Sequence, residues 1–243
     1  MSDYRNFPQT ASGANVGIDQ GLRAYMLRVY NYMTAGLVLT GGVAYATYAA
    51  AVGADGQLTS FGATLFHGPL MLVLMLVTVG MVFAMSFALE RMSVAMAQLL
   101  FWAYAALNGV TFSSIGLTYA HSSITHVFLI TAATFGAMSL YGYTTKRDLT
   151  GMGSFLFMGL IGLLIASIAG IFFQSSAFQM ALAVIGVLIF TGFTAYDTQA
   201  IKSMYYAGGS GLMEHAAIRG ALRLYLDFIN LFLSFLRLFG DRR

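Results

Sequence analysis

The chain of 243 residues contains no cysteine, which excludes disulfide bonds, thiolate metal ligands and catalysis by a cysteine nucleophile. Charge is also scarce, because only 9% of the residues are Asp, Glu, Lys or Arg, whereas a soluble domain usually carries about 25%. So few charges cannot coat a surface that faces water. We therefore expect lipid to cover much of this protein.

Basic clusters and an N-terminal apolar core are missing as well. The formal net charge is only +3, and no run of Lys and Arg with interleaved aromatic residues suggests a nucleic-acid partner. Residues 1–20 are polar and lack the apolar stretch of a cleaved secretory signal. We expect residues 1–20 to be a disordered N-terminus and residues 21–243 to form one transmembrane domain.

Long hydrophobic runs dominate the rest of the chain, which is 58% hydrophobic with a mean hydropathy of +0.76. A helix needs about 20 apolar residues to cross the hydrocarbon layer, and only helices or closed barrels satisfy the backbone there. The sequence predicts an all-α membrane protein, a seven-transmembrane-helix bundle. The seven predicted segments are 25–52, 69–89, 93–119, 124–145, 153–173, 178–201 and 218–239.

The basic residues alternate between the loops of this arrangement. The connections at 53–68, 120–123 and 174–177 contain no Lys or Arg, whereas the alternate connections and the N-terminal region do. By the positive-inside rule the N-terminus is expected in the cytoplasm and the C-terminus outside. Arg237 and the two terminal arginines oppose this reading. Either their side chains reach the outer interface, or the last segment is re-entrant.

Two acidic residues lie inside the last two predicted spans, Asp197 in the sixth and Asp227 in the seventh. A carboxylate in a bilayer costs about 2.5–3.5 kcal/mol on insertion scales, so it needs a partner, a water-filled cavity or a proton. The default hypothesis is an ion or proton site. The alternative is a neutral aspartate that only strengthens helix packing.

The two acids are expected at similar depth on the cytoplasmic side. Asp197 lies five residues before Lys202, about 7–8 Å from the end of its helix, and Asp227 lies eight residues after Arg219, about 12 Å from the same end. Arg91 opens the third predicted span from that side. Three charges that are distant in sequence therefore converge on one membrane depth.

Polar residues follow one face of each of these two helices. The face on the seventh helix suggests the lining of an internal path, and the alternative is a structural hydrogen-bonded seam between helices. On the seventh helix the face consists of Arg223, Asp227, Asn230, Ser234 and Arg237, and on the sixth of Thr191, Thr194, Asp197 and Thr198.

Two adjacent carboxyl groups would share one proton and titrate as a unit, which makes a pH-dependent latch. When ionised, Asp197 and Asp227 would supply the hard oxygen ligands that Ca²⁺ prefers. We expect such binding to be transient, with Ca²⁺ as a transported ion and with no resident cofactor.

Four stretches of the sequence resemble the Bax inhibitor family, the proteins with the transmembrane Bax inhibitor motif, in its bacterial branch. The resemblance runs from about residue 20 to the C-terminus. The stretches are LRVYNYMTAGL within 22–37, GYTTKRDLTGMGSFLFMGLIG at 142–162, AYDTQAI at 195–201 and LYLDFINLFLSFLRLFG at 224–240.

The resemblance implies a seven-helix bundle in which the last helix is central and surrounded by the other six. It implies a pH-sensitive Ca²⁺ leak with Asp197 and Asp227 as the sensing dyad. An arginine at the position of Arg91 would pair with the dyad in the closed form, although Glu90 before it departs from the usual basic run and would compete for Arg91. Bacterial members are also linked to regulation of membrane-bound proteases, and eukaryotic members to suppression of cell death.

Two other functions stay open at this point. An intramembrane aspartyl protease also uses two aspartates on consecutive helices, and Tyr196-Asp197 fits its first motif, but Leu226 stands where its second motif requires Gly and the Pro-Ala-Leu motif is absent. A regulator that binds a membrane protease without transporting ions is compatible with every residue considered. The favoured reading is a pH-gated Ca²⁺ leak in the bacterial inner membrane that is not an enzyme.

Overall fold

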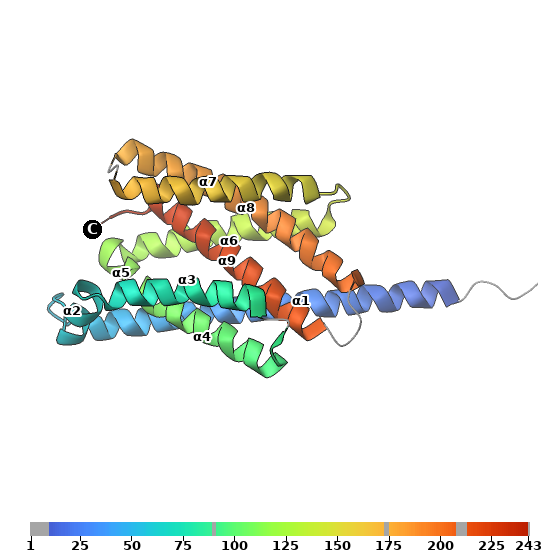
Figure 1. Cartoon of the computed structure of the whole chain (residues 1–243), viewed down its shortest axis with the longest axis horizontal. Helices are drawn as coiled ribbons and strands as arrows, with labels where there is room; N and C mark the ends of the chain where they lie inside the picture. The colour runs from blue at the N-terminus through green and yellow to red at the C-terminus, as the bar shows by residue number, and fades with distance from the viewer. Residues whose placement is uncertain (1–9, 89–90, 173–174, 208–212, 243) are drawn as a thin grey trace, which may run out of the picture.

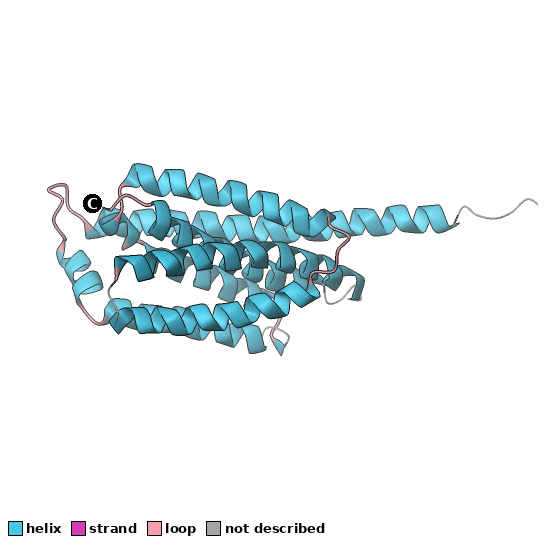
Figure 2. Ribbon diagram, turned by 90° about the horizontal axis from the view of Figure 1, so that it is seen from above, coloured by secondary structure: helices cyan, strands magenta, loops and turns pink. Residues whose placement is uncertain are grey.

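The computed structural model describes residues 10–88, 91–172, 175–207 and 213–242 (Figures 1 and 2). Within these ranges the chain is helical and its elements run roughly parallel to one axis. The helices are α1 (Thr10–Ala51), α2 (Ser60–His67), α3 (Leu70–Ala88), α4 (Val94–Phe112), α5 (Ile115–Thr118), α6 (His121–Thr144), α7 (Thr150–Phe172), α8 (Ser176–Ala207) and α9 (Met213–Phe239).

The long helices α1, α3, α4, α6, α7, α8 and α9 follow the seven predicted segments in order. The main difference is at the start of α1, which begins at Thr10 and extends beyond the rest of the bundle (Figure 1). Residues 10–20 form the first turns of α1, whereas residues 1–9 lie outside the described ranges, and the expectation of a disordered N-terminus stays a prediction. The third segment is also broken, because α4 ends at Phe112 and the short α5 follows after a turn.

Five of the helical stretches are long and apolar enough to cross a membrane: Leu70–Ala88, Val94–Thr118, His121–Thr144, Thr150–Gly170 and Ser176–Tyr205. Large apolar side chains on their outer faces, such as Leu76 and Phe83 of α3 and Phe155 and Ile165 of α7, are exposed by half or more. A continuous belt of this kind belongs in lipid rather than water. The chain is therefore a multi-pass helical membrane protein.

The last helix occupies the centre of the bundle. Four helices, α1, α4, α6 and α8, make the main contacts with α9, while α3 and α7 pack mainly on α4 and α8. α9 carries charged residues and is less apolar than the spans around it. A helix that contacts mainly protein does not need a surface that is apolar on every side.

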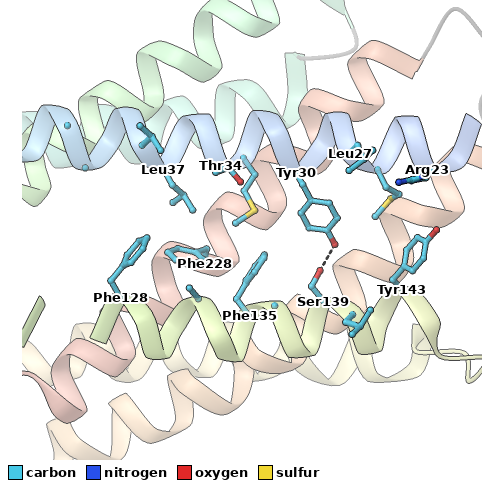
Figure 3. Close-up of a pocket in the computed structure, with 18 residues that line it drawn as sticks. Arg23, Leu27, Tyr30, Thr34, Leu37, Phe128, Phe135, Ser139, Tyr143 and Phe228 are labelled. Carbon is cyan, nitrogen blue, oxygen red and sulfur yellow. Dashed lines mark hydrogen bonds between the residues drawn. The ribbon is translucent and has the colours of Figure 1, made fainter. Parts of the chain in front are cut away.

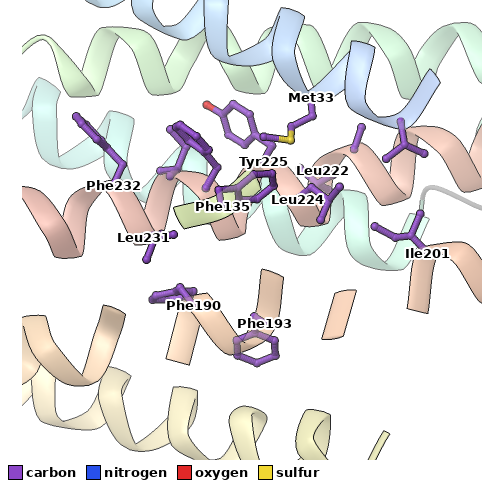
Figure 4. Close-up of a cluster of buried hydrophobic side chains, with 14 of the residues drawn as sticks. Met33, Phe135, Phe190, Phe193, Ile201, Leu222, Leu224, Tyr225, Leu231 and Phe232 are labelled. Atoms are coloured by element: carbon purple, nitrogen blue, oxygen red, sulfur yellow. The ribbon is translucent and has the colours of Figure 1, made fainter. Parts of the chain in front are cut away.

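The sides of α9 differ in how tightly they are covered. α1 and α6 face each other across a groove, and Phe228 of α9 lies between them (Figure 3). On other sides α9 is covered more tightly: Leu224, Tyr225 and Leu231 are completely buried, among side chains of α1, α6 and α8 (Figure 4).

The C-terminus lies at the end of the bundle that carries α2 and α5, opposite the start of α1 (Figure 1). α9 is one continuous helix of 27 residues, about 40 Å long, and does not turn back. The amide of Ala120 donates to the carbonyl of Asp241 at 3.0 Å, and Arg242 lies over the ring of Tyr119. The re-entrant alternative for the last segment is therefore wrong, and Arg237 is exposed near this far end.

Candidate functional site

The part of α8 that carries Asp197 is fixed by the link between α6 and α7. Gln199 accepts a hydrogen bond from the amide of Leu149 at 2.8 Å and donates to the carbonyl of Arg147 at 2.8 Å. Lys202 donates to the carbonyl of Tyr143 at 2.9 Å. The AYDTQAI and GYTTKRDLTG stretches are thus two halves of one contact, which sets the height and rotation of α8.

Two glycines allow the same helices to approach closely. A Cβ at Gly142 of α6 would lie 2.2 Å from the carbonyl oxygen of Ala195, and a Cβ at Gly153 of α7 would lie 2.4 Å from the ring of Tyr196. No larger residue fits at either position without moving the neighbouring helix. The residues on both sides of the Tyr196-Asp197 step are therefore clamped between α6 and α7.

The part of α9 that carries Asp227 is anchored from its other side. Tyr225 is completely buried, and its hydroxyl bonds to the hydroxyl of Thr40 at 2.7 Å. The hydroxyl of Thr40 also lies 2.8 Å from the carbonyl oxygen of Ala105, in position to donate a hydrogen bond to it. One small network therefore joins α1, α4 and α9. Because residues two apart on a helix point to nearly opposite sides, this anchor directs Asp227 away from α1 and α4 toward α8.

Asp197 and Asp227 come together as the sequence predicts. Both residues are buried, and their carboxyl groups are close enough for the charge of one to act on the other. Oδ2 of Asp227 receives no hydrogen bond from any described donor. Since carboxylates only accept, a hydrogen bond between the two acids requires a proton on one of them.

The positive charge beside the pair comes from Arg223. Its Nη1 lies 3.5 Å from Oδ1 of Asp197, and its side chain is 41% exposed. Arg223 was expected on the polar face of α9 as a residue that lines a path, and not as the partner of the acids. Arg91, the expected partner, is exposed at the start of the α4 region and forms no ion pair with either aspartate. The suggested competition by Glu90 falls outside the described residues.

The other residues expected to line a path satisfy their hydrogen bonds on their own helices. The hydroxyl of Thr194 donates to Phe190, the amide of Asn230 to Leu226, and the hydroxyl of Ser234 to Asn230. This pattern is typical of polar residues in membrane helices. It leaves the oxygen lone pairs of Thr194 and Ser234 free to accept a further bond or to approach a cation.

The oxygen ligands near the pair are few. Among the described residues no group of three or more His, Asp or Glu side chains is arranged to hold a metal ion. Two carboxylates and neighbouring hydroxyl groups supply fewer oxygens than the six to eight that Ca²⁺ takes in a tight site. The arrangement suits brief contact with a passing cation rather than storage.

A second charged cluster, which the sequence did not suggest, fixes the start of α9. Glu214 pairs with Arg28 of α1, and it accepts a hydrogen bond from Tyr32 at 2.9 Å. His215 bonds to the carbonyl of Met92 at 2.9 Å. The scarcity of acidic residues could have pointed to this cluster. Only nine Asp and Glu occur in the chain, and each one that is buried or half-buried needs a partner.

Fold and site together define a multi-pass helical membrane protein with a pair of buried carboxylic acids beside its central helix. The family model described as Inhibitor of apoptosis-promoting Bax1 matches residues 22–243, and the chain belongs to this Bax inhibitor family.

Two bacterial relatives match over nearly the whole chain, and a third matches over part of it. The inner membrane protein YbhL of Escherichia coli strain K12 is 45% identical over 227 residues, which are 92% of this chain and 94% of YbhL. An uncharacterized protein of Rickettsia prowazekii is 46% identical over 245 residues, covering 100% of both chains. An uncharacterized membrane protein of Streptococcus pyogenes is 46% identical over 141 residues, 58% of this chain and 62% of its own.

Proposed function

We propose that this protein is a cation leak of the bacterial inner membrane, with Ca²⁺ as the preferred ion, gated by the proton that Asp197 and Asp227 share. The observation that carries the proposal is the burial of two adjacent carboxyl groups between α8 and the central α9, with one guanidinium beside them. A packing role alone needs one neutral acid and no counter-charge.

The proposal includes seven membrane spans. α1 and α9 complete the five strongly apolar spans, and α9 needs less apolar surface because the other helices cover it. An odd number of spans agrees with chain ends at opposite ends of the bundle (Figure 1). The positive-inside pattern then places the N-terminus, and the end of the bundle nearer the two acids, in the cytoplasm.

Charge balance explains how the proton gates the path. With one shared proton, Asp197, Asp227 and Arg223 carry no net charge together. Loss of that proton leaves a buried negative charge, and gain of a second leaves Arg223 without an ionised partner. Either imbalance is costly between packed helices, so the contact between α8 and α9 changes with pH.

The ionised pair is also the state that a cation can use. Two carboxylates, together with the lone pairs of Thr194 and Ser234 and with water, offer hard oxygen ligands in the cytoplasmic half of the membrane. Neither aspartate lines any of the three cavities found on the described surface. Conduction therefore requires α8 and α9 to separate around the pair.

Arg91 keeps a role in this proposal only in a second conformation. His215 ties the segment after Arg91 to the first turn of α9, twelve residues before Asp227, or about 18 Å along the helix. For Arg91 to close the path by pairing with the acids, that segment would have to move toward Asp197 and Asp227. In the conformation described here Arg223 supplies the counter-charge.

A flux assay in liposomes that contain only this protein tests the proposal. Wild type should release trapped Ca²⁺ faster than empty liposomes, with a rate that depends on pH. Absence of flux from folded protein would contradict a leak. If the silent protein still binds a membrane protease, its function is regulation rather than transport.

A further inference from the structure

The groove between α1 and α6 has a volume of about 960 Å³, and neither aspartate lines it. Its walls are mainly apolar, formed by side chains such as Leu27 and Leu37 of α1 and Phe128 and Phe135 of α6 (Figure 3). Phe228 of α9 lies between the walls (Figure 3). The groove is therefore open to the membrane on one side and closed by the central helix on the other.

Three glycines keep this groove empty. A Cβ at Gly41 or Gly42 of α1, or at Gly136 of α6, would meet no heavy atom within 4 Å. Glycines between membrane helices usually allow close approach, as Gly142 does. Here they have the opposite effect, since they leave room beside the helices that an aliphatic side chain would fill.

One end of the groove is basic. Arg23 and Tyr143 face each other there (Figure 3), and Nζ of Lys202 lies 4.8 Å from the centroid of the Tyr143 ring. Among the described side chains none forms an ion pair with Arg23, and no acidic residue lines the groove. The end that holds Arg23 is thus prepared for an anion, and the rest for an apolar chain.

The groove is long enough for a lipid headgroup and one acyl chain. Its lining on α1 runs from Arg23 to Gly42, nineteen residues or about 28 Å along the helix, whereas one leaflet contributes about 15 Å of hydrocarbon. We infer that the groove binds one acyl chain of an anionic phospholipid, with the phosphate at Arg23 and Lys202 and the tail reaching Phe228. The lipid belongs to the leaflet at the basic end, which is the cytoplasmic one in the proposed orientation.

The single tryptophan of the chain makes this binding measurable. In a Trp102→Phe background, Phe128→Trp places a reporter in the groove, and Phe157→Trp places one on the exposed face of α7. The protein is reconstituted in phosphatidylcholine with a minor fraction of phosphatidylglycerol, and bromine on the acyl chains of one lipid or the other quenches nearby tryptophan. The groove reporter should show about fivefold enrichment of the anionic lipid per basic residue engaged. The reporter on α7 should show none.

Two further variants separate the groove from general lipid contact. Arg23→Gln should remove most of the selectivity, and Gly136→Leu should remove access of either brominated chain to the reporter. Gly162→Leu on α7 is the matched control, because a Cβ there also meets nothing within 4 Å. Quenching at Phe128→Trp that only follows the mole fraction of each lipid, or selectivity that survives loss of both Arg23 and Lys202, would overturn the inference.

Native mass spectrometry of the unsubstituted protein gives an independent reading that needs no reporter. Wild type should retain one anionic lipid that Arg23→Gln and Gly136→Leu lose. If Gly136→Leu instead converts a dimer to a monomer without changing lipid retention, a second copy of the chain occupies the groove and the lipid assignment is wrong. Because these readouts measure binding and not flux, they stand or fall separately from the leak.

Discussion

Arg223 of α9 places its Nη1 3.5 Å from Oδ1 of Asp197 on α8, while Asp227 lies one helical turn after Arg223 on the same helix. The guanidinium of Arg223 therefore pairs with the acid on α8 and lies one turn from the acid on its own helix. This arrangement ties the charge of the pair to the packing of α8 against α9, and the following predictions depend on it.

Replacing Arg223 should change how flux depends on pH. In Arg223→Gln the ionised acids lose their nearest positive charge, so the midpoint of the flux–pH curve should move to higher pH. Arg223→Lys should move it less, because the charge remains. Arg91→Gln is the comparison, since Arg91 pairs with neither acid in this conformation, and it should move the midpoint less than Arg223→Gln does. A midpoint that responds to Arg91→Gln but not to Arg223→Gln would show that the counter-charge has been assigned to the wrong arginine.

Calcium and the proton should compete for the pair. A cation binds the ionised carboxylates, and binding therefore releases the shared proton. Raising Ca²⁺ should move the loss of the protonated-carboxyl infrared band to lower pH in wild type and have no effect in Asp227→Asn. Mg²⁺, which holds its water more tightly, is the comparison ion and should shift the band less. An unchanged band at every Ca²⁺ concentration would mean that the cation never reaches the acids.

Gly142→Ala should lower the stability of the folded protein strongly, although it adds only one methyl group. The added methyl would sit 2.2 Å from the carbonyl oxygen of Ala195, which forces α6 away from α8. We expect a loss of about 1–3 kcal/mol in the free energy of unfolding, or more, from overpacking of this kind. Gly136→Ala on the same helix meets open space and should be nearly neutral. Equal thermal stability of the two variants in detergent would contradict the close contact.

Gln199→Ala should loosen the link between α6 and α7. It removes two hydrogen bonds and leaves the amide of Leu149 without its acceptor, a loss of about 1–3 kcal/mol. Hydrogen exchange of residues 146–150 should become faster. Gln179→Ala at the other end of α8 loses one longer bond, to Gly170 at 3.3 Å, and should leave that segment unchanged. If hydrogen exchange of residues 146–150 is unaltered in Gln199→Ala, the link between α6 and α7 does not anchor the part of α8 that carries Asp197.

The sequence predicted the long helices well because the length of an apolar run is set by the membrane. It did less well where polar residues continue or interrupt a helix. The first turns of α1 contain many polar residues, so hydropathy does not predict them. The break between α4 and α5 falls at Ser113 and Ser114, inside a segment whose hydropathy predicts one continuous span.

For the site, depth along each helix was enough to bring Asp197 and Asp227 together, because helix rise is fixed. Depth alone could not identify the arginine that pairs with the acids. Depth favoured Arg91, but the choice between Arg91 and Arg223 depends on how α9 is rotated against α8, and that rotation is set by contacts such as Tyr225 with Thr40 and Gln199 with Leu149. The cluster around Glu214 was missed for the same reason.

The most direct test follows the proton and the flux in the same reconstituted protein. Infrared titration reports the protonated carboxyl of the pair, and Ca²⁺ release from liposomes reports the path. The account predicts that both curves share one midpoint in wild type, and that Asp197→Asn and Asp227→Asn each abolish the band and flatten the flux. A pH profile of flux that persists unchanged in both variants would contradict it.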